Sequence, residues 1–362
     1  MERLYLMGRN AWIVVSDLHE SYRNKDNRYD YLKETALVRE EIIDIGKKYK
    51  ELGINPKLIL LGDVYDRSFK DVTKAALTNN FWILAKSIFT EIYSVLGNHE
   101  TSFYKDNPFY TLVQNIESTK VKGILNKVWT PLGVLGTIQV PDLITDGNVC
   151  FHFNHHNTAV STAIEGKYNV GLFHQDFVTK EIVDCMKNQF GNTEFITKST
   201  LNLDGTNLLD NYNVCFFGHL HKVYGTWRFK NDLNGKETLL YYLASLGRPN
   251  ASEVIDSFLE RNIPAVIVDD GNFVRIEDNK FYLPSRAECI KETVLQEQQE
   301  KRKEYKDNVF ERHYKPTTDN PIESLLQRCA QDPQLYTLAE GLLNNPIDEL
   351  GKEILDTYRK VI

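Results

Sequence analysis

The sequence predicts an α/β protein in which two layered β-sheets carry helices on their outer faces. Its first hundred residues alternate short runs of β-branched and apolar residues with longer stretches of helical spacing. This order is typical of a largely parallel sheet with right-handed crossovers. Further short β-type runs recur in the second half. At 362 residues and 42% hydrophobic composition, the chain can bury the core of one large domain and still leave an appendage.

Three strands and two helices are predicted in the first third of the chain. The runs 11–15, 57–61 and 92–96 are predicted strands because β-branched, aliphatic and aromatic residues dominate them. Between them, 29–52 and 71–88 place apolar residues at helical spacing. Ligands collect in the loops that leave the carboxyl ends of parallel strands, so the residues after each strand are the first candidates for a functional site.

The second half is expected to supply a second group of strands. Two runs, 169–173 and 214–217, each end at a histidine-bearing cluster. Three shorter runs are expected to form antiparallel strands: 239–243, 265–268 and 273–276. Asp270-Gly271 joins the last two, and an Asp-Gly pair is a strong hairpin signal.

Five short polar clusters follow the predicted strands in a fixed order. Each is a weak signal alone, because a single Asp or His at a strand end is usually a turn or capping residue. Together they are a strong signal. The clusters are Asp17-Leu18-His19, Gly62-Asp63-Val64-Tyr65-Asp66-Arg67, Gly97-Asn98-His99-Glu100, Phe173-His174-Gln175 and Gly218-His219-Leu220-His221. The stretch 179–212 between the last two is longer than a turn requires and is a candidate for substrate selection.

These residue types predict two adjacent metal ions. Two cations about 3.5 to 4 Å apart can hold both a hydroxide nucleophile and the phosphoryl oxygens of a phosphate ester. Such a pair needs one shared anionic ligand, which we assign to Asp63. The other predicted ligands are Asp17, His19 and His221 for one ion, and Asn98, His174 and His219 for the other. Imidazole, carboxylate and amide ligands without thiolates favour manganese, with iron, zinc and magnesium as alternatives, over calcium or a structural zinc site.

His99 is predicted to act on the substrate. If its segment is extended, the side chains of Asn98 and His99 leave the backbone on opposite sides. We expect His99 to protonate the leaving oxygen or to steady phosphoryl charge, with Asp66 fixing its tautomer and orientation. The alternative is that His99 is one more metal ligand. Arg67 either pairs with a phosphate oxygen, whose geometry its planar fork matches, or forms a surface ion pair.

The five clusters together resemble the calcineurin-like metallophosphoesterase superfamily, whose signature blocks are DxH, GDxxD, GNH(D/E), a His-bearing strand end and GHxH. All five blocks are intact between Trp12 and Ser245. The resemblance implies a four-layer metallophosphoesterase sandwich of two mixed β-sheets flanked by helices. It also implies a metal-dependent hydrolase of phosphoesters.

Within that superfamily the chain is most similar to nuclease subunits of the SbcD type, which belong to the double-strand-break repair complex and have phage relatives. The similarity rests on Leu172-Phe173-His174-Gln175, on residues 101–107 and on residues 243–248. It implies exonuclease or endonuclease action on single-stranded DNA or duplex ends. It further implies a coiled-coil ATPase partner that docks on the C-terminal extension, and a homodimer as another assembly.

Two observations keep other functions open. Asp66-Arg67 is similar to the GDxxDR block of Ser/Thr protein phosphatases, although Ser68 and Leu96 depart from the phosphatase pattern. The alternative function is therefore a phosphomonoesterase or a phosphodiesterase of small molecules such as nucleotides. A third possible function is that of a non-catalytic scaffold, but the intact ligand set argues against it.

A net charge of −7 argues against a protein that coats nucleic acid by bulk charge. It does not argue against a nuclease whose partner holds the DNA.

Composition also predicts the compartment. No stretch of about 18 consecutive apolar residues is present, so no membrane span is expected, and the first residues lack the pattern of a signal peptide. Five widely spaced cysteines fit free thiols in a reducing compartment better than a disulfide framework. We expect a cytoplasmic protein without membrane association.

The composition shifts after about Pro284. Residues 287–315 are dense in Glu, Lys and Gln, and apolar residues return beyond Pro321. We therefore predict a catalytic domain at 1–284 and a charged, mostly helical extension at 285–362. The extension either packs on its own domain or docks a partner.

Three further histidines, His152, His155 and His156, stand close together in the sequence. They resemble a metal cluster, but they fall at the end of an expected strand. We expect a strand end that brings His155 or His156 near the substrate, and not a third metal.

Overall fold

The structure is a computed structural model in which the main described segments lie between residues 8 and 283. These segments are 8–20, 31–66, 72–102, 107–125, 136–190, 200–221, 225–231, 234–248 and 260–283, and residues 296, 299 and 300 are described as well. The chain divides into two compact units, Met1–Lys291 and Glu292–Ile362. Arg67, the predicted boundary at 284/285 and nearly all of the predicted extension lie outside the described residues.

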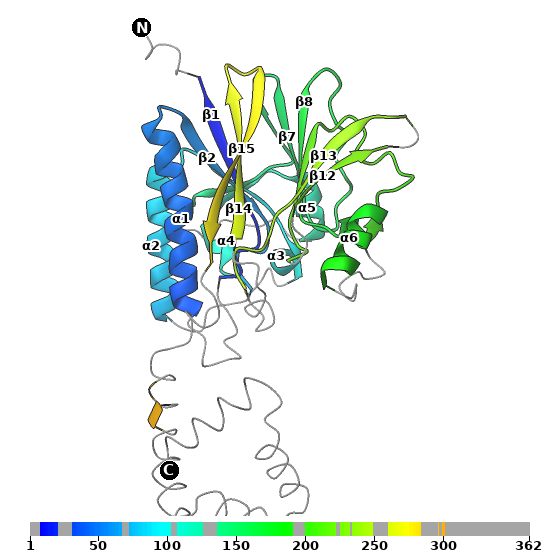
Figure 1. Ribbon diagram of the computed structural model, residues 1–362. Coiled ribbons are helices and arrows are strands. Elements are labelled where there is room, and N and C mark those ends of the chain that lie inside the picture. Colours follow the sequence, from blue (N-terminus) through cyan, green and yellow to red (C-terminus); the bar gives the residue numbers. More distant parts are fainter. Residues whose placement is uncertain are drawn as a thin grey trace, which may run out of the picture. The chain divides into compact units, whose positions relative to one another are not determined.

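The first of two sheets in the main unit is a seven-stranded mixed sheet (Figure 1). Its spatial order is β15-β14-β1-β2-β3-β5-β4, in which β14 and β15 are antiparallel additions to a parallel core. The strands are β1 (Asn10–Val15), β2 (Asn55–Leu61), β3 (Ile92–Val95), β4 (Val113–Ile116), β5 (Ile138–Val140), β14 (Glu260–Asp269) and β15 (Phe273–Tyr282). Helices α1 (Tyr31–Glu51) and α2 (Val72–Ile88) make the crossovers between β1, β2 and β3, as the alternating sequence pattern predicts.

The second is a six-stranded mixed sheet in the order β12-β13-β11-β8-β7-β6. Its strands are β6 (Leu143–Asp146), β7 (Val149–Asn154), β8 (Tyr168–Phe173), β11 (Val214–Phe217), β12 (Gly225–Lys230) and β13 (Glu237–Tyr242). The shorter elements are α3 (Asn98–Ser102), α4 (Phe109–Leu112), α5 (Thr119–Ile124), β9 (Phe177–Val178), α6 (Lys180–Phe190) and β10 (Leu201–Asn202).

Three separate apolar cores define four layers. In β1 the alternate residues Ala11, Ile13 and Val15 pack among residues of α1, α2 and the first sheet, whereas Trp12 and Val14 pack against the second sheet. This division follows from the two-residue period of a strand. A third core joins the far face of the second sheet to α6 and its neighbouring loops.

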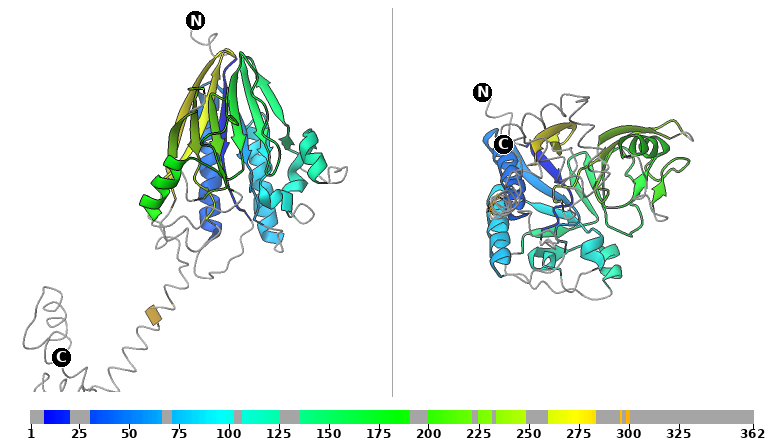
Figure 2. Two further views of the ribbon diagram at one scale, coloured as in Figure 1. Left: turned by 90° about the vertical axis from the view of Figure 1, so that its right-hand side faces the viewer. Right: turned by 60° about the horizontal axis from the view of Figure 1, so that its bottom comes forward.

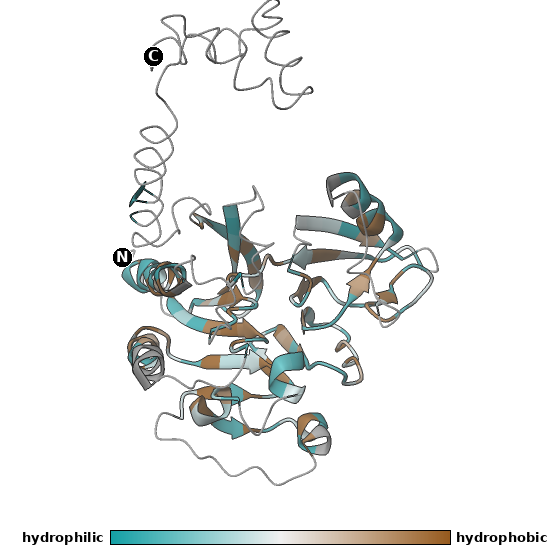
Figure 3. Ribbon diagram, turned by 90° about the horizontal axis from the view of Figure 1, so that it is seen from below, coloured by the Kyte–Doolittle hydropathy of each residue, from teal (hydrophilic) through white to brown (hydrophobic). Residues whose placement is uncertain are grey.

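The layers are visible in the other views. The two sheets lie face to face (Figure 2), and apolar residues concentrate on the strands between the flanking helices (Figure 3). At the centre of the sandwich, Trp12 stacks on Phe151 with ring centroids 4.2 Å apart and on Tyr93 at 5.7 Å. The predicted four-layer α/β sandwich of two mixed sheets is therefore confirmed for the main unit.

Two details of the prediction are wrong, and one is correct in part. Strand β13 pairs antiparallel with β12, as predicted, but parallel with β11, because β12 runs along the sheet edge and its hairpin returns the chain beside β11. Strands β14 and β15 are ten residues long instead of short. The segment that begins at Asn98 is the helix α3 and not an extended chain.

No helix among the described residues is long and apolar enough to cross a membrane. The described cysteines Cys150, Cys185 and Cys215 carry free thiols.

Candidate metal centre

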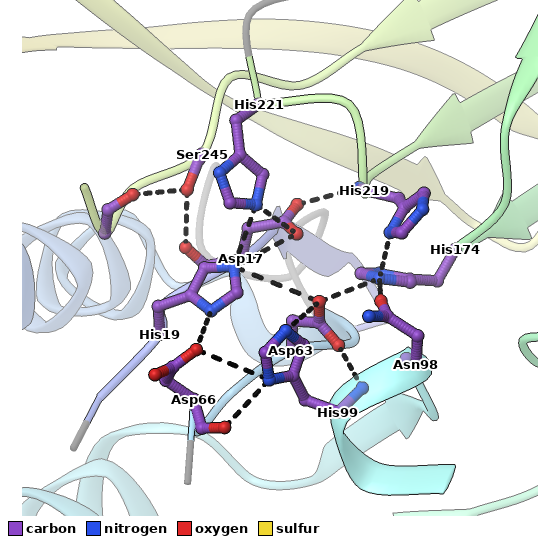
Figure 4. A network of polar contacts seen from close by, with 12 residues as sticks. Asp17, His19, Asp63, Asp66, Asn98, His99, His174, His219, His221 and Ser245 are labelled. Atoms are coloured by element: carbon purple, nitrogen blue, oxygen red, sulfur yellow. Dashed lines mark hydrogen bonds and ion pairs between the residues drawn. The ribbon is translucent and has the colours of Figure 1, made fainter. Parts of the chain in front are cut away.

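The seven predicted metal ligands converge where the two sheets meet (Figure 4). Each follows the carboxyl end of a strand, so segments far apart in the sequence arrive at one place. From the first sheet come Asp17 and His19 after β1, Asp63 after β2 and Asn98 after β3; from the second come His174 after β8, and His219 and His221 after β11.

Asp63 lies between the two groups. Its Oδ2 is 3.2 Å from Nε2 of His174 on one side and 3.9 Å from Nε2 of His19 on the other. Its Oδ1 accepts a hydrogen bond from the backbone N–H of His99 at 3.0 Å. One carboxylate oxygen is thus fixed by the backbone while the other faces both groups, which is the geometry that a bridging ligand needs.

Asp17, His19 and His221 form what we call the first cluster, in which all three side chains offer a ligand atom within 4.8 Å of the others. Oδ2 of Asp17 accepts hydrogen bonds from the hydroxyl of Ser16 and from the backbone N–H of His219. Its Oδ1 points inward, 3.5 Å from Nε2 of His221 and 3.8 Å from Nε2 of His19. That buried oxygen accepts no hydrogen bond within the described part of the chain, and a cation would satisfy it.

Asn98, His174 and His219 form the second cluster. Nδ1 of His174 faces the carbonyl oxygen of Leu61, which only accepts, so Nδ1 carries the proton and donates it. Nε2 of His174 then faces Oδ1 of Asn98 at 3.1 Å, Oδ2 of Asp63 at 3.2 Å and Nδ1 of His219 at 3.2 Å. Four oxygen and nitrogen donors around one point, with no thiolate, fit a divalent ion of the manganese, iron, zinc or magnesium type.

The charge balance of the site favours a cation. Burial would lower the pKa of His174, but the adjacent charge of Asp63 outweighs it and raises that pKa to about 9. Burial would raise the pKa values of Asp63 and Asp17, yet contact with His174 and His221 holds both well below their usual range. The two carboxylates are therefore ionised, and the position next to Nε2 of His174 attracts positive charge.

Four of the seven predicted ligands have a left-handed backbone. The φ angles are 52° at Asp17, 43° at His19, 49° at Asp63 and 79° at His219, a region that costs a non-glycine residue about 1 kcal/mol. Backbone hydrogen bonds hold these turns, among them the bond from His19 N–H to the Asp63 carbonyl at 2.9 Å. Such local strain is typical of functional sites.

Glu100 braces the site in a way that the sequence did not reveal. The side chain is fully buried, and it accepts hydrogen bonds at 2.9 Å from the backbone N–H groups of Asp63, Val64 and Gly97. A side chain at Gly97 would collide with the Asp63 carboxylate, so glycine is required there. Glu100 stands inside the predicted GNHE cluster, but its partners are mainly backbone groups of another loop, which no local pattern shows.

Ser245 braces the first cluster from the segment that follows β13. Its hydroxyl donates to the carbonyl of Asp17 at 3.0 Å, and the backbone N–H of Gly247 donates to the same carbonyl at 2.9 Å. Next along the chain, Arg248 is paired with Glu34 of α1, and both side chains are buried. The segment 245–248 therefore ties the first cluster to the outer helix layer.

His99 lies beside Asp63 and Asp66. Its Nδ1 is 2.8 Å from the main-chain carbonyl of Asp66 and 3.4 Å from the Asp66 carboxylate. Because a carbonyl only accepts, Nδ1 carries a proton and Nε2 faces the cluster, 3.8 Å from Oδ2 of Asp63. The expected control of His99 by Asp66 thus runs mainly through the backbone. His99, Asp66 and His19 also lie close enough together to hold an ion, so the ligand alternative for His99 stays open.

The other three histidines take different places. His152 is buried with Nε2 2.8 Å from Asn169 Oδ1. His155 is fully buried and accepts the backbone N–H of Leu96, which excludes direct substrate contact. His156 is half-buried, with its ring centroid 5.7 Å from that of His219. In the described part of the chain, none of the three belongs to a group that could hold a metal.

A model of one protein family covers the site and most of the two sheets. The match to the calcineurin-like phosphoesterase family spans residues 13–223. The chain belongs to the calcineurin-like phosphoesterase family. This family uses divalent metal ions, so the predicted class of metal-dependent phosphoester hydrolase is supported.

Solved structures that match the chain include three enzymes of low sequence identity. A 5'-nucleotidase precursor from Thermus thermophilus shares 14% identity (TM-score 0.37), with 83% of this chain and 59% of that chain covered. The NAD nucleotidase NadN from Haemophilus influenzae shares 15% identity (TM-score 0.35), with 76% of this chain and 50% of that chain covered. The sulfate thiohydrolase SoxB from Thermus thermophilus shares 11% identity (TM-score 0.33), with 85% of this chain and 62% of that chain covered. The chain thus spans about half to three fifths of these structures. No curated protein matches it significantly in sequence.

Proposed function

We propose that the protein is a two-metal phosphodiesterase that hydrolyses DNA, with the nuclease subunits of the SbcD type as the nearest functional class. The observation that carries the hydrolytic part is the position of Asp63 Oδ2, which faces His19 on one side and His174 on the other. The nuclease part is supported by the sequence details around the fourth polar cluster and after the third and fifth.

Each side chain of the site has a defined task in this proposal. Asp63 would hold both metal ions, with Asp17, His19 and His221 completing the site of one, and Asn98, His174 and His219 completing the site of the other. When bound, two divalent ions activate the attacking water and neutralise charge on the phosphoryl oxygens. His99 presents Nε2 toward the reacting group and gives a proton to the leaving oxygen, while the Asp66 carbonyl keeps Nδ1 protonated.

The metal and the partners follow from the same proposal. Manganese is the proposed metal, because mixed imidazole, carboxylate and amide donors suit it. The net charge of −7 is unfavourable for unaided binding to a polyanion, so the nuclease proposal requires a partner that holds DNA. From the resemblance to SbcD-type subunits we propose a coiled-coil ATPase bound by residues 285–362, with Arg67 as a phosphate contact.

The test compares polymer and small substrates on one enzyme preparation. Purified protein with manganese is incubated with labelled single-stranded DNA, labelled duplex DNA, p-nitrophenyl phosphate and bis-p-nitrophenyl phosphate. We expect DNA and the bis ester to be cleaved, and we expect Asp63→Asn protein, purified in parallel, to be inactive. Hydrolysis of the monoester alone, with both DNA substrates intact, would overturn the nuclease proposal.

The second candidate is a nucleotide phosphomonoesterase. The net charge of −7 favours it, since a small substrate needs no extended basic surface. The same assay decides between the two when nucleoside monophosphates are added to the panel: release of inorganic phosphate from them without cleavage of DNA identifies the monoesterase.

A further inference from the structure

Asp176, which lies outside all five predicted clusters, contacts a ligand of the second cluster. Its Oδ1 is 2.9 Å from Nε2 of His219, while Nδ1 of the same ring is 3.2 Å from Nε2 of His174. The imidazole of His219 therefore has a carboxylate on one side and the second cluster on the other.

The surrounding structure fixes the place of Asp176. Its backbone carbonyl accepts the N–H of Leu201 at 2.7 Å, where β9 pairs with β10. The next residue, Phe177, is buried in the third core, and its carbonyl accepts the hydroxyl of Tyr242 at 3.0 Å. Asp176 is thus held shortly after the end of β8 by a packed segment and not by a loose loop.

The carboxylate of Asp176 is largely shielded from solvent. Only 12% of the side chain is exposed, against 22% for His219. Its Oδ1 is shielded from solvent and, within the described residues, accepts no hydrogen bond of regular geometry. The contact with His219 is therefore a close approach of a carboxylate oxygen to a ring nitrogen, 2.9 Å apart.

This arrangement selects one tautomer of His219. A neutral imidazole carries one proton, and a carboxylate beside Nε2 keeps the proton there. The lone pair of Nδ1 is then directed at the second cluster. A carboxylate behind a metal-binding histidine also makes the ring a better donor and fixes its orientation.

We propose that Asp176 is the positioning residue of the second cluster, which holds His219 in the tautomer that can bind a metal ion. The inference rests on the two-metal function proposed above. In the same cluster, the carbonyl of Leu61 does the corresponding task for His174. In the second cluster, a backbone carbonyl thus fixes the tautomer of His174, and a side chain, which can be substituted, fixes the tautomer of His219.

Asp176→Asn is the decisive variant. It keeps the shape of the side chain, but its amide can donate to Nε2 and so favour the wrong tautomer of His219. Asp204→Asn is the matched control. Asp204 follows β10, and its carboxylate accepts a hydrogen bond from the backbone N–H of Lys180, which is not a predicted metal ligand. The two variants lose the same charge, so a difference between them is not a general electrostatic effect.

Calorimetric titration with Mn²⁺ measures the effect on each ion. We expect wild-type protein and Asp204→Asn to bind two ions, and Asp176→Asn to bind one of them about 10- to 100-fold more weakly with the other unchanged. Ring ¹⁵N spectra of the metal-free proteins give a second readout. His219 should be protonated at Nε2 in wild type and shifted toward the Nδ1 tautomer in Asp176→Asn, with Asp176→Glu restoring part of the affinity.

Three results would overturn the inference. Two ions of unchanged affinity in Asp176→Asn would remove the role of Asp176 and leave the proposed function standing. Equal weakening of both ions together with a lower melting temperature would show a general structural role. Wild-type protein that binds no ion would overturn the proposed function and this inference together.

Discussion

The two clusters that meet at Asp63 are supported in different ways. In the first cluster, the carboxylate of Asp17 is anchored, but Nε2 of His19 and Nε2 of His221 face each other at 2.8 Å, and Nδ1 of His19 makes no hydrogen bond among the described residues. In the second, the carbonyl of Leu61 accepts from Nδ1 of His174, and the carboxylate of Asp176 lies 2.9 Å from Nε2 of His219.

The same contrast appears in the affinity for protons. Burial, together with the nearby His221, lowers the pKa of His19 to about 3, whereas the charge of Asp63 outweighs burial and raises that of His174 to about 9. In the metal-free protein the second cluster thus holds a proton at His174 that an ion must displace. Because an oxygen lies behind each of its two imidazoles, we expect the second cluster to bind its ion more tightly.

The largest effect is expected from the residue that both clusters share. Asp63→Asn should abolish binding of both ions and lower activity at least about 10⁴-fold, because about 5 kcal/mol or more of charge stabilisation is lost. In the presence of manganese the melting temperature should also fall, since the variant gains no stability from bound metal. Metal content by mass spectrometry and thermal unfolding check this. A variant that retains one tightly bound ion would show that Asp63 does not bridge.

His99→Ala should separate chemistry from metal binding. Loss of a general acid typically lowers turnover about 10²- to 10⁴-fold, and we expect both ions to remain. Steady-state kinetics with calorimetry on the same sample measure the two quantities. If an ion is lost instead, His99 is a ligand, as its proximity to His19 and Asp66 also allows.

A matched pair of substitutions tests the expected order of affinity. His174→Ala should weaken the tighter ion and His221→Ala the weaker one, each by more than the roughly 10- to 100-fold that loss of an outer-shell partner costs, because each removes a direct ligand. Titration of each variant with Mn²⁺ gives both constants. If His221→Ala weakens the tighter ion instead, the first cluster binds its ion more tightly than the second, and the expected order of affinity is wrong.

Glu100→Gln should act on stability first. The amide nitrogen of Gln cannot accept a hydrogen bond, so at least one of the three backbone N–H groups loses its partner, at a cost of about 1–3 kcal/mol. Urea unfolding at pH 8 measures the change. Glu117→Gln is the control, because Glu117 is exposed and its carboxylate accepts from the side-chain amide of Asn115, itself exposed. Equal stability of the two variants would mean that the brace is unimportant.

The effect of His155 is expected on stability alone, and it depends on pH. Burial lowers its pKa from 6.5 to about 4, so the unfolded chain binds the proton more strongly. Its contribution is therefore complete above pH 6.5 and falls as the pH drops toward 4, by about 3 kcal/mol in total. His155→Gln should be less stable than wild type at pH 7.5, with the gap narrowing at pH 4.5. A constant gap in urea unfolding would contradict this.

The sequence was most informative where strand ends carry ligands. The runs before Asp17, Asp63 and His174 are apolar and contiguous, so their composition alone located the strands. The metal-binding chemistry of the polar residues that follow them predicted that these residues lie together. The extended conformation predicted at Asn98 was wrong because the backbone N–H of Thr101 bonds to the carbonyl of Gly97 and closes a helical turn.

Residues that act through distant partners were not predictable in this way. Asp176 meets His219 only because β8 and β11 are neighbours in the second sheet, and Glu100 binds backbone groups that follow β2. The sequence around Asp176 or Glu100 does not show which distant group the carboxylate contacts, because that depends on how the strands are arranged in the fold. The parallel pairing of β13 was missed for a similar reason, because it depends on where β12 is placed.

The origin of the ligands in both sheets has a consequence for how the protein folds. Neither half of the sandwich holds all of the predicted ligands, so high-affinity binding of a metal ion should wait until the two halves have docked across Trp12 and Phe151. In a refolding experiment, ion uptake would therefore report the closing of the central interface and lag behind the formation of secondary structure.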